Sequence, residues 1–492
     1  MLVPAQKTLD PPIERNPPNK FWEGHTILPS PPTPPHPHGG GDRRRFCCRR
    51  PESPSTRRTM GSLMFSVWAG TLAMMVPHVW PYLHANLSNR FTSALLLAAL
   101  IARCHGYGAG GSRRGVFTHF QLGYALGVSG LLVVLVVTWP EISVRRALAQ
   151  GDVTALLQAM DTHDWHQGHS RHACSALATF AGTSVNNSEV LASSGGITRL
   201  LNSMEQHPAA AEVQASASAA LALMARNNTI NKARILENKG VVRALQAMRD
   251  HGDNAEVQIQ GCAVLTELAV GDERARTDIS RAGGIMRVIL MLRAHSMHGA
   301  VQAAGCAVLR SLAASDACKL EAAEAGGLQL VADALKLHLD YPQLALHACW
   351  ALRNLAGIDE NRGRIAQTGA IALLVDVVAA YAGRDPGIVE HAAGALRNLA
   401  VNADDNKRRI IDANGLARLV HALNAHPDHL GVQDAALWAL MIIAWSDGAL
   451  QRQVAAAGAQ AVARSFLDSP AAIAAPHTCE RARTLLGKLP RL

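Results

Sequence analysis

Three arginines and two tryptophans recur at positions from which they could bind an acidic peptide. Arg310, Arg353 and Arg397 lie 43 and 44 residues apart. Guanidinium groups bind carboxylates through paired hydrogen bonds, and side-chain amides can bond the backbone of an extended segment. We therefore predict that these arginines and their neighbours bind a protein partner. The predicted binding residues are Arg310, Ser311, Trp350, Arg353, Asn354, Arg397, Asn398 and Trp438. The alternative is that the arginine stems pack along a solvated helix face and Trp350 fills the core.

The other reactive side chains do not form a pattern typical of an enzyme. His163, His166, His169 and His172 are spaced by three residues, but Gly168 interrupts the run and the neighbouring residues lack a recognised ligand spacing. We find no phosphate-binding glycine loop, no nucleophile elbow and no His-Glu-x-x-His motif. The sequence therefore predicts a protein that is not an enzyme and holds no metal or cofactor.

Nine cysteines are present, and four of them share one column of a repeat. Cys174, Cys262, Cys306 and Cys349 each precede a leucine by three residues. Other repeats have small or apolar residues there, which is typical of a packing site. We predict buried thiols, too far apart for disulfides because equivalent positions lie one helix layer, roughly 8–10 Å, apart.

A period of 43 or 44 residues positions all these side chains. Two independent columns keep it: a leucine column and a column of small residues that starts each second helix. The leucines are Leu177, Leu221, Leu265, Leu309, Leu352, Leu396 and Leu440. The small residues are Gly196, Gly240, Gly284, Gly327, Ala370, Gly415 and Ala459. A repeat of this length is typical of a helical solenoid, whose units bury their apolar faces by stacking on one another.

Within one unit the apolar spacing predicts three helices and no strand. The clearest unit has a short helix at 361–365, a turn at Thr368-Gly369, a second helix at 370–380, a polar loop, and a third helix at 388–401. Residues 152–160 read as the first copy of the second helix. We expect glycine at the turn before the second helix, such as Gly369, to adopt a backbone angle that other residues resist.

The excess positive charge lies outside the repeats. Residues 1–149 hold 16 Lys and Arg against 6 Asp and Glu, whereas residues 150–492 hold 31 against 32. Because a nearly neutral solenoid has no field that follows a phosphate backbone, we predict no nucleic-acid binding. A basic excess beside apolar segments is typical of a membrane anchor.

The N-terminal third divides into a tail and a membrane region. Residues 1–59 are rich in proline and arginine, which predicts a disordered tail; an alternative is that Met60 is the first residue. Cys47 and Cys48, beside a basic run that could bind anionic lipid, are possible acylation sites. The predicted membrane region is 60–141, with spans at about 62–83 and 120–139 and a shorter apolar segment at 91–102.

The basic flanks set the expected orientation. Seven arginines lie between Arg43 and Arg58, before the first span, and Arg145 and Arg146 follow the last. Two spans would leave both the tail and the solenoid in the cytosol. Three spans would place the solenoid across the membrane, which Arg113 and Arg114 would favour. We favour two, and the sequence does not identify the membrane.

The repeat resembles the armadillo family. The segments HACWALRNLAG at 347–357 and HAAGALRNLA at 391–400, with GGI leading a second helix, carry that pattern. The resemblance covers about 142–470, seven units and a partial eighth, with 471–492 as a C-terminal cap and tail. It implies an all-α, right-handed superhelical solenoid similar to importin alpha, beta-catenin and the vacuolar armadillo protein. Val-Gln pairs such as Val257-Gln258 are similar to the armadillo region of the leucine-rich-repeat kinase.

In importin-like members of the family, the third helices line a concave groove in which a Trp and an Asn four residues later hold an extended peptide. Trp350 and Asn354 reproduce that pair; Asn398 has Gly394 in the Trp position, and Trp438 has Ile442 in the Asn position. The chain is therefore expected to be a membrane-anchored scaffold that binds partner proteins in its concave groove. The alternatives are an assembly or regulatory subunit of a membrane complex, or an importin-like peptide carrier.

Overall fold

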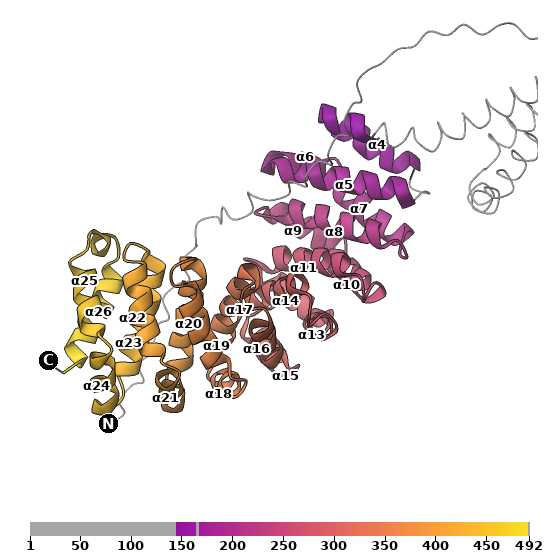
Figure 1. The fold of residues 1–492 in the computed structure, drawn as a ribbon. Coiled ribbons are helices and arrows are strands. Elements are labelled where there is room, and N and C mark those ends of the chain that lie inside the picture. The colour runs from indigo at the N-terminus through magenta and orange to yellow at the C-terminus, as the bar shows by residue number, and fades with distance from the viewer. Residues whose placement is uncertain (1–143, 164–166, 491–492) are drawn as a thin grey trace, which may run out of the picture. The chain divides into compact units, whose positions relative to one another are not determined.

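The computed structural model describes residues 144–163 and 167–490, where the helices stack in repeats of three (Figure 1). The first helices are α6 (Val185–Ser193), α9 (Thr229–Glu237), α12 (Glu273–Arg281), α15 (Asp316–Glu324), α18 (Asp359–Gln367), α21 (Asp404–Asp412) and α24 (Gly448–Ala456). The second helices are α4 (Val153–His163), α7 (Gly196–Gln206), α10 (Gly240–Asp250), α13 (Gly284–Ala294), α16 (Gly327–Leu337), α19 (Ala370–Tyr381), α22 (Gly415–Ala425) and α25 (Ala459–Leu467). The third helices are α5 (Gln167–Thr183), α8 (Ala211–Ala225), α11 (Ala255–Ala269), α14 (Gly299–Leu312), α17 (Pro342–Leu355), α20 (Pro386–Ala400), α23 (Leu430–Ala444) and α26 (Pro476–Lys488).

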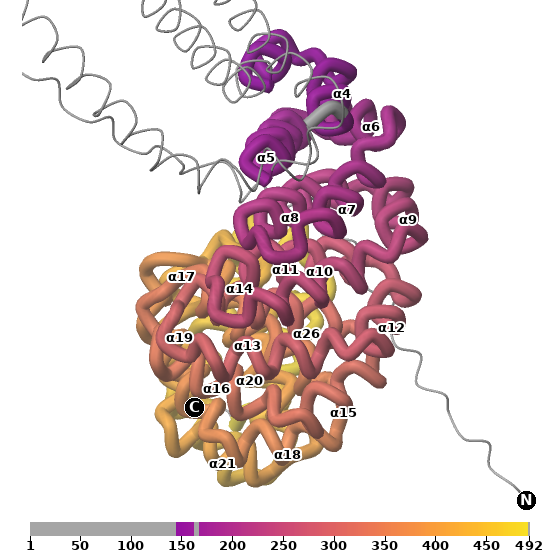
Figure 2. Tube along the Cα trace, turned by 90° about the vertical axis from the view of Figure 1, so that its right-hand side faces the viewer, coloured from indigo at the N-terminus to yellow at the C-terminus, as the bar shows by residue number. Residues whose placement is uncertain are grey.

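Equivalent helices of neighbouring repeats pack on one another. Each third helix contacts the third helix of the next repeat, from α5 to α26, and each second helix contacts the next second helix, from α4 to α25. In Figure 2 the first helices α6, α9, α12, α15 and α18 follow each other along one side. The part of the chain that the structure describes contains helices and no strand. The predicted all-α solenoid is confirmed.

The helix boundaries agree closely with the predicted unit. The three helices expected at 361–365, 370–380 and 388–401 are α18, α19 and α20. Within the expected C-terminal cap and tail, 471–492, the residues from Pro476 to Lys488 form α26. A 3₁₀ helix, η1 (Pro470–Ala474), precedes α26, which packs on α23 as the other third helices pack on their predecessors. The repeat pattern therefore continues past residue 470.

The predicted backbone angle of the turn glycine is confirmed, because Gly369 has a φ of 78°. The left-handed residue is the one before the column; it is Gly283 (φ 78°) ahead of α13, for example, and Lys239 (φ 61°) ahead of α10. Gly284 itself is helical. A Cβ on Gly284 would lie 2.5 Å from Ile279 Cγ2, so this glycine is needed because the second helix starts close against the first.

The Val-Gln pairs position the third helix. Nε2 of Gln258 donates to the backbone oxygens of Met248 and His251, at 2.8 Å each, at the end of the second helix. Gln302 makes the same two bonds one repeat later. Because buried carbonyl groups at a helix C-terminus need partners, these glutamines fix the start of the third helix against the end of the second.

The core runs along the stack and contains both predicted columns. Leu265, Leu352 and Leu396 are fully buried, like the rest of the leucine column. The predicted cysteine column is also buried, and its thiols are free. Burial raises the pKa of Cys262 to about 12, so the thiol stays protonated. The prediction of packing thiols is confirmed.

The predicted tail, both predicted spans, the segment at 91–102 and the acylation candidates Cys47 and Cys48 lie outside the described residues. Within the described residues, no single helix is long and apolar enough to cross a membrane. One bent pair of helices reaches the length and apolar composition of a membrane span when the two are taken together; it is Asp359–Gln367 with Ala370–Tyr381.

Candidate functional site

The predicted binding residues gather on consecutive third helices. Together with neighbours that the structure adds, they form a row that we call the arginine–aromatic strip. Its members come from α14, α17, α20, α23 and α26 in turn. They are Arg310, Trp350, Arg353, His391, Arg397, Trp438 and Arg481. All except the buried His391 are partly exposed, so one edge of the strip faces solvent.

Trp350 lies between groups from the helices on either side of it. The guanidinium carbon of Arg310, from the preceding helix, is 4.4 Å from the indole centroid. The imidazole of His391, from the following helix, stacks on the indole with ring centroids 4.1 Å apart and an interplanar angle of 20°. Cation–π and stacking contacts of this kind join three successive repeats. The indole faces are therefore used within the chain.

Trp438, two repeats later on α23, also lies between groups from the neighbouring third helices. The guanidinium of Arg397, from α20, lies 4.2 Å from its centroid, and that of Arg481, from α26, lies 3.8 Å away. Arg481 also pairs with the carboxylate of Asp434, which accepts a hydrogen bond of 2.8 Å from the Thr478 hydroxyl. The last third helix thus completes the strip.

The predicted polar groups form hydrogen bonds within the chain, two of them between repeats. Nδ2 of Asn354 donates to the backbone oxygen of Arg310 at 3.0 Å, and Nδ2 of Asn398 donates to that of Arg353 at 2.7 Å. The hydroxyl of the buried Ser311 donates to the backbone oxygen of Ala307 at 3.0 Å. These side chains satisfy carbonyl groups near the ends of the third helices.

The glycine in the tryptophan column makes room for an arginine. A Cβ on Gly394 would lie 2.9 Å from Cδ and 3.0 Å from Nε of Arg353. The departure from the Trp–Asn pattern at this repeat thus has a steric reason: the Arg353 stem crosses α20 where the indole would otherwise sit. Nη1 of Arg353 then reaches Nδ1 of His391 at 3.1 Å and a carboxylate oxygen of Glu390 at 3.6 Å.

His391 of the strip and His347, its equivalent on α17, are both neutral at neutral pH. Burial, and then the neighbouring arginine, lower the pKa of His391 to about 3, and the same causes lower that of His347 to about 3. Nη1 of Arg310 lies 3.3 Å from Nδ1 of His347. Since arginine can only donate, each Nδ1 accepts and the ring proton resides on Nε2. Cationic Arg310 and Arg353 therefore each donate to a neutral imidazole on the next third helix.

Positive charge on the strip is only partly balanced. Arg353 and Arg481 each have a carboxylate within 4 Å, at Glu390 and Asp434. Among the described residues, Arg310 and Arg397 have none. Burial lowers the pKa of Arg310 to about 10 and that of Arg397 to about 9, which leaves both cationic at neutral pH. The strip thus holds two partly buried cations with no carboxylate within 4 Å. Glu267 and Glu390 favour the charged forms of Arg310 and Arg397 from further away.

Sequence reasoning missed Glu390, Asp434 and Arg481. The column of Trp350, Gly394 and Trp438, followed 43 residues further, ends on Arg481. That signal was present and would have added the last cation. Glu390 and Asp434 each lie one residue before the repeat position that His391 occupies. Because the other repeats are mostly apolar there, a single sequence gives little indication of these two acids.

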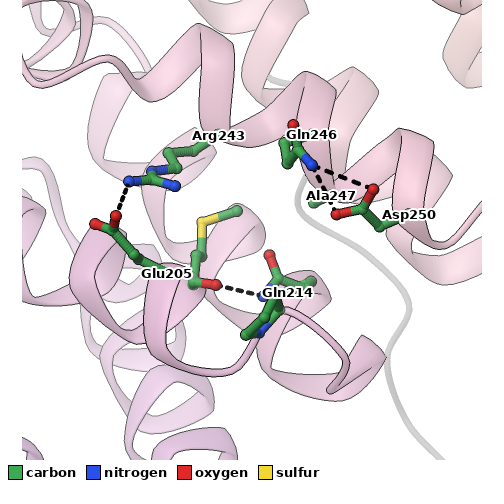
Figure 3. Close-up of a pocket in the computed structure, with 8 residues that line it drawn as sticks. Glu205, Gln214, Arg243, Gln246, Ala247 and Asp250 are labelled. Atoms are coloured by element: carbon green, nitrogen blue, oxygen red, sulfur yellow. Dashed lines mark hydrogen bonds and ion pairs between the residues drawn. The ribbon is translucent and has the colours of Figure 1, made fainter.

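A separate pocket lies between second helices. It encloses about 320 Å³ between α7 and α10, with Glu205, Gln214, Arg243, Gln246 and Asp250 in its lining (Figure 3). Arg243 pairs with Glu205 at 2.5 Å, and Gln246 donates to Asp250. No group of His, Cys, Asp and Glu in the described ranges could hold a metal ion.

Comparison with known proteins supports the armadillo assignment. The model of the LRRK2 ARM repeat matches residues 151–287, and that of the Armadillo/beta-catenin-like repeat matches residues 403–441. No curated protein sequence matches the chain. The two family matches agree with the repeat pattern at both ends of the solenoid.

Solved structures show the same fold. The crystal structure of an engineered protein is similar over 71% of this chain and 81% of that protein, with a TM-score of 0.60 and 24% identity. A structure from work on a phosphorylation switch that controls the interaction between cadherin and beta-catenin is similar over 71% of this chain and 65% of that chain, with a TM-score of 0.57 and 18% identity. At these identities the likeness concerns the fold. The described part of the chain is an armadillo-like solenoid.

Proposed function

We propose that this chain is a membrane-anchored scaffold that binds an acidic, extended segment of a partner protein along the arginine–aromatic strip. The observation that carries this proposal is the pair of partly buried guanidinium groups, Arg310 and Arg397, which have no carboxylate within 4 Å among the described residues. A partner carboxylate could pair directly with such a guanidinium group in bidentate geometry. Such charge pairs gain strength where solvent is partly excluded.

An extended protein segment fits the strip better than a small anion does. The cations are spread over successive third helices from α14 to α26, so one small anion cannot reach Arg310 and Arg397 together. A segment that runs across the third helices meets the cations in turn. Solenoids present long surfaces of this kind, and their stacked repeats support recognition of extended chains.

The proposed recognition differs from that of an importin-like carrier. In such a carrier, the tryptophan packs on the side-chain stems of the bound peptide, and the asparagine amide forms hydrogen bonds with the peptide backbone. Here Trp350 is flanked by Arg310 and His391, and the Asn354 amide donates to a backbone oxygen of this chain. We therefore assign recognition to the guanidinium groups, whose five N–H donors exceed what the contacts within the chain use.

Membrane anchoring rests on the sequence. The segments at 62–83 and 120–139 are long enough to cross about 30 Å of hydrocarbon and are flanked by arginines. Anchoring would raise the local concentration of whatever the strip binds. Carbonate extraction tests this part: an anchored chain stays with the membrane, whereas a chain that washes off is not anchored. Proteolysis of intact membranes with a tag at each terminus then fixes the side on which the solenoid lies.

Peptide titration tests the binding part. The full chain would be titrated with a fluorescent ten-residue peptide containing spaced glutamates, and with matched peptides containing glutamine or lysine. We expect the glutamate peptide to bind at least tenfold more tightly than the glutamine peptide, and the lysine peptide not to bind. Equal affinity for the glutamate and glutamine peptides would reject an acidic partner.

A further inference from the structure

Ion pairs join the second helices of the first repeats. Nε and Nη2 of Arg199 donate to the two carboxylate oxygens of Asp161 at 2.8 Å each, which links α7 to α4. Arg243 pairs with Glu205 at 2.5 Å, which links α10 to α7 (Figure 3). In both pairs the acid precedes the arginine by 38 residues. We call the equivalent contact between each two successive second helices a rung. The first two rungs are thus both acid–arginine pairs.

The third rung has the opposite charge at the acid position. The residue 38 positions before Arg287 is Arg249, so two arginines occupy the equivalent positions where α10 packs on α13. Neither arginine has a carboxylate within ion-pair distance among the described residues. Nε of Arg287 is buried and has no hydrogen-bond partner. Burial, and then the charge of Arg249, lower the pKa of Arg287.

The neighbouring groups do not supply the missing anion. Asp250, next to Arg249, accepts from Gln246 Nε2 at 2.9 and 3.2 Å. At the fourth rung, Arg293 faces Leu330 in place of an arginine, and its Nη2 lies 3.5 Å from a backbone oxygen, that of Ala325. The paired cations therefore occur at one rung, between α10 and α13.

Apolar side chains are exposed on the two helices that carry these arginines. On α10 Val242 is 54% exposed, and on α13 Met286 and Leu290 are 49% and 46% exposed. Leu290 follows Arg287 by three residues, which places it on the neighbouring part of the helix face. Exposed apolar groups beside two cations favour an anion carried on a peptide over a free ion.

We propose that α10 and α13 form a binding site for a phosphorylated side chain of a partner protein, held by Arg249 and Arg287. A phosphate monoester carries about −1.5 to −2 charges at neutral pH and three acceptor oxygens, so it can neutralise both guanidinium groups. One carboxylate would balance only one of them. This site belongs to the second-helix layer and does not depend on the function proposed for the arginine–aromatic strip.

The test uses a substitution that rebuilds the rung seen in the earlier repeats. Arg249→Glu would place an acid opposite Arg287, as Glu205 lies opposite Arg243. The full chain, this variant and a control, Arg418→Glu, would be titrated with Gly-Leu-phosphoserine-Leu-Gly and with its serine and glutamate forms. Arg418 is exposed on α22, so the control makes the same charge change elsewhere.

We expect the phosphoserine peptide to bind the wild type and Arg418→Glu equally, and to bind Arg249→Glu at least tenfold more weakly. We also expect inorganic phosphate to compete, and Arg249→Glu to melt at a higher temperature than the wild type. Undiminished binding to Arg249→Glu would overturn the site. Equal binding of the serine form would overturn it too, and equal binding of the glutamate form would overturn the assignment to phosphate.

Discussion

Nδ2 of Asn398 donates a hydrogen bond of 2.7 Å to the backbone oxygen of Arg353, which lies one repeat earlier. The same asparagine accepts from its neighbour Arg397, whose Nε and Nη2 lie 3.0 and 2.8 Å from Oδ1. One amide thus ties α20 to α17 and orients the guanidinium that faces Trp438. The geometry of the strip depends on contacts between repeats as much as on the residues that face solvent.

Removal of this amide should loosen the repeats around it. We expect Asn398→Ala to lower the free energy of unfolding by about 1–2 kcal/mol, because the Arg353 carbonyl loses its side-chain donor. Amide hydrogen exchange in α17 and α20 is the suitable measurement, since stacked repeats need not unfold in one step. Asn202→Ala, at an exposed position of α7, is the control. Equal exchange rates in the two variants would contradict the role assigned to the amide.

Acid should weaken the solenoid through its buried histidines. An unfolded histidine titrates near pH 6.5, whereas the folded pKa of His391 is about 3. Between these values the unfolded chain binds more protons, so stability is complete above about pH 6.5 and falls as the pH is lowered. The loss is at most about 1.4 kcal/mol per pH unit for each such histidine.

His391→Gln should therefore flatten the acid side of the stability profile. Glutamine keeps an acceptor for Arg353 but does not titrate. The melting temperature would be measured from pH 7 to pH 4, with His421→Gln at an exposed position of α22 as the control. The two variants should diverge as the pH falls; parallel curves would show that His391 does not contribute.

The two classes of glycine should respond to alanine in opposite ways. Gly284→Ala should destabilise by about 1–3 kcal/mol, because its Cβ would overlap the Ile279 side chain. Gly363→Ala should stabilise by about 0.5–1 kcal/mol, since nothing lies within 4 Å of its Cβ position and the site is helical. Denaturant unfolding of both variants checks the signs.

Much of this fold could be predicted from the sequence, because the 43- or 44-residue period of the repeat is visible without knowing how any side chain packs. Two columns with one spacing give the repeat, and the apolar spacing within 370–380 gives α19. The turn glycine was predicted correctly, but the packing role of the glycine after it was missed, since a single sequence does not separate a glycine required by φ, such as Gly283, from one required by close packing, such as Gly284.

The interior of the candidate site was harder to predict. Trp350 and Asn354 were placed on the correct helix, but their partners lie on neighbouring repeats, about 40 residues away in sequence. Whether an indole faces a ligand or is flanked by Arg310 and His391 depends on rotamers and on the offset between adjacent helices. Those quantities arise from packing and leave no pattern along the chain.

The central claim is that the positive charge of the strip binds an acidic partner, and this claim can be tested directly. The affinity of the glutamate peptide would be determined for the wild type, for the double variant Arg310→Gln/Arg397→Gln, and for Arg408→Gln/Arg418→Gln, which removes two exposed arginines outside the third helices. If Arg310 and Arg397 bind the partner, the first double variant binds at least tenfold more weakly and the second binds as the wild type does. Equal losses in both double variants would show a general charge effect and contradict the account.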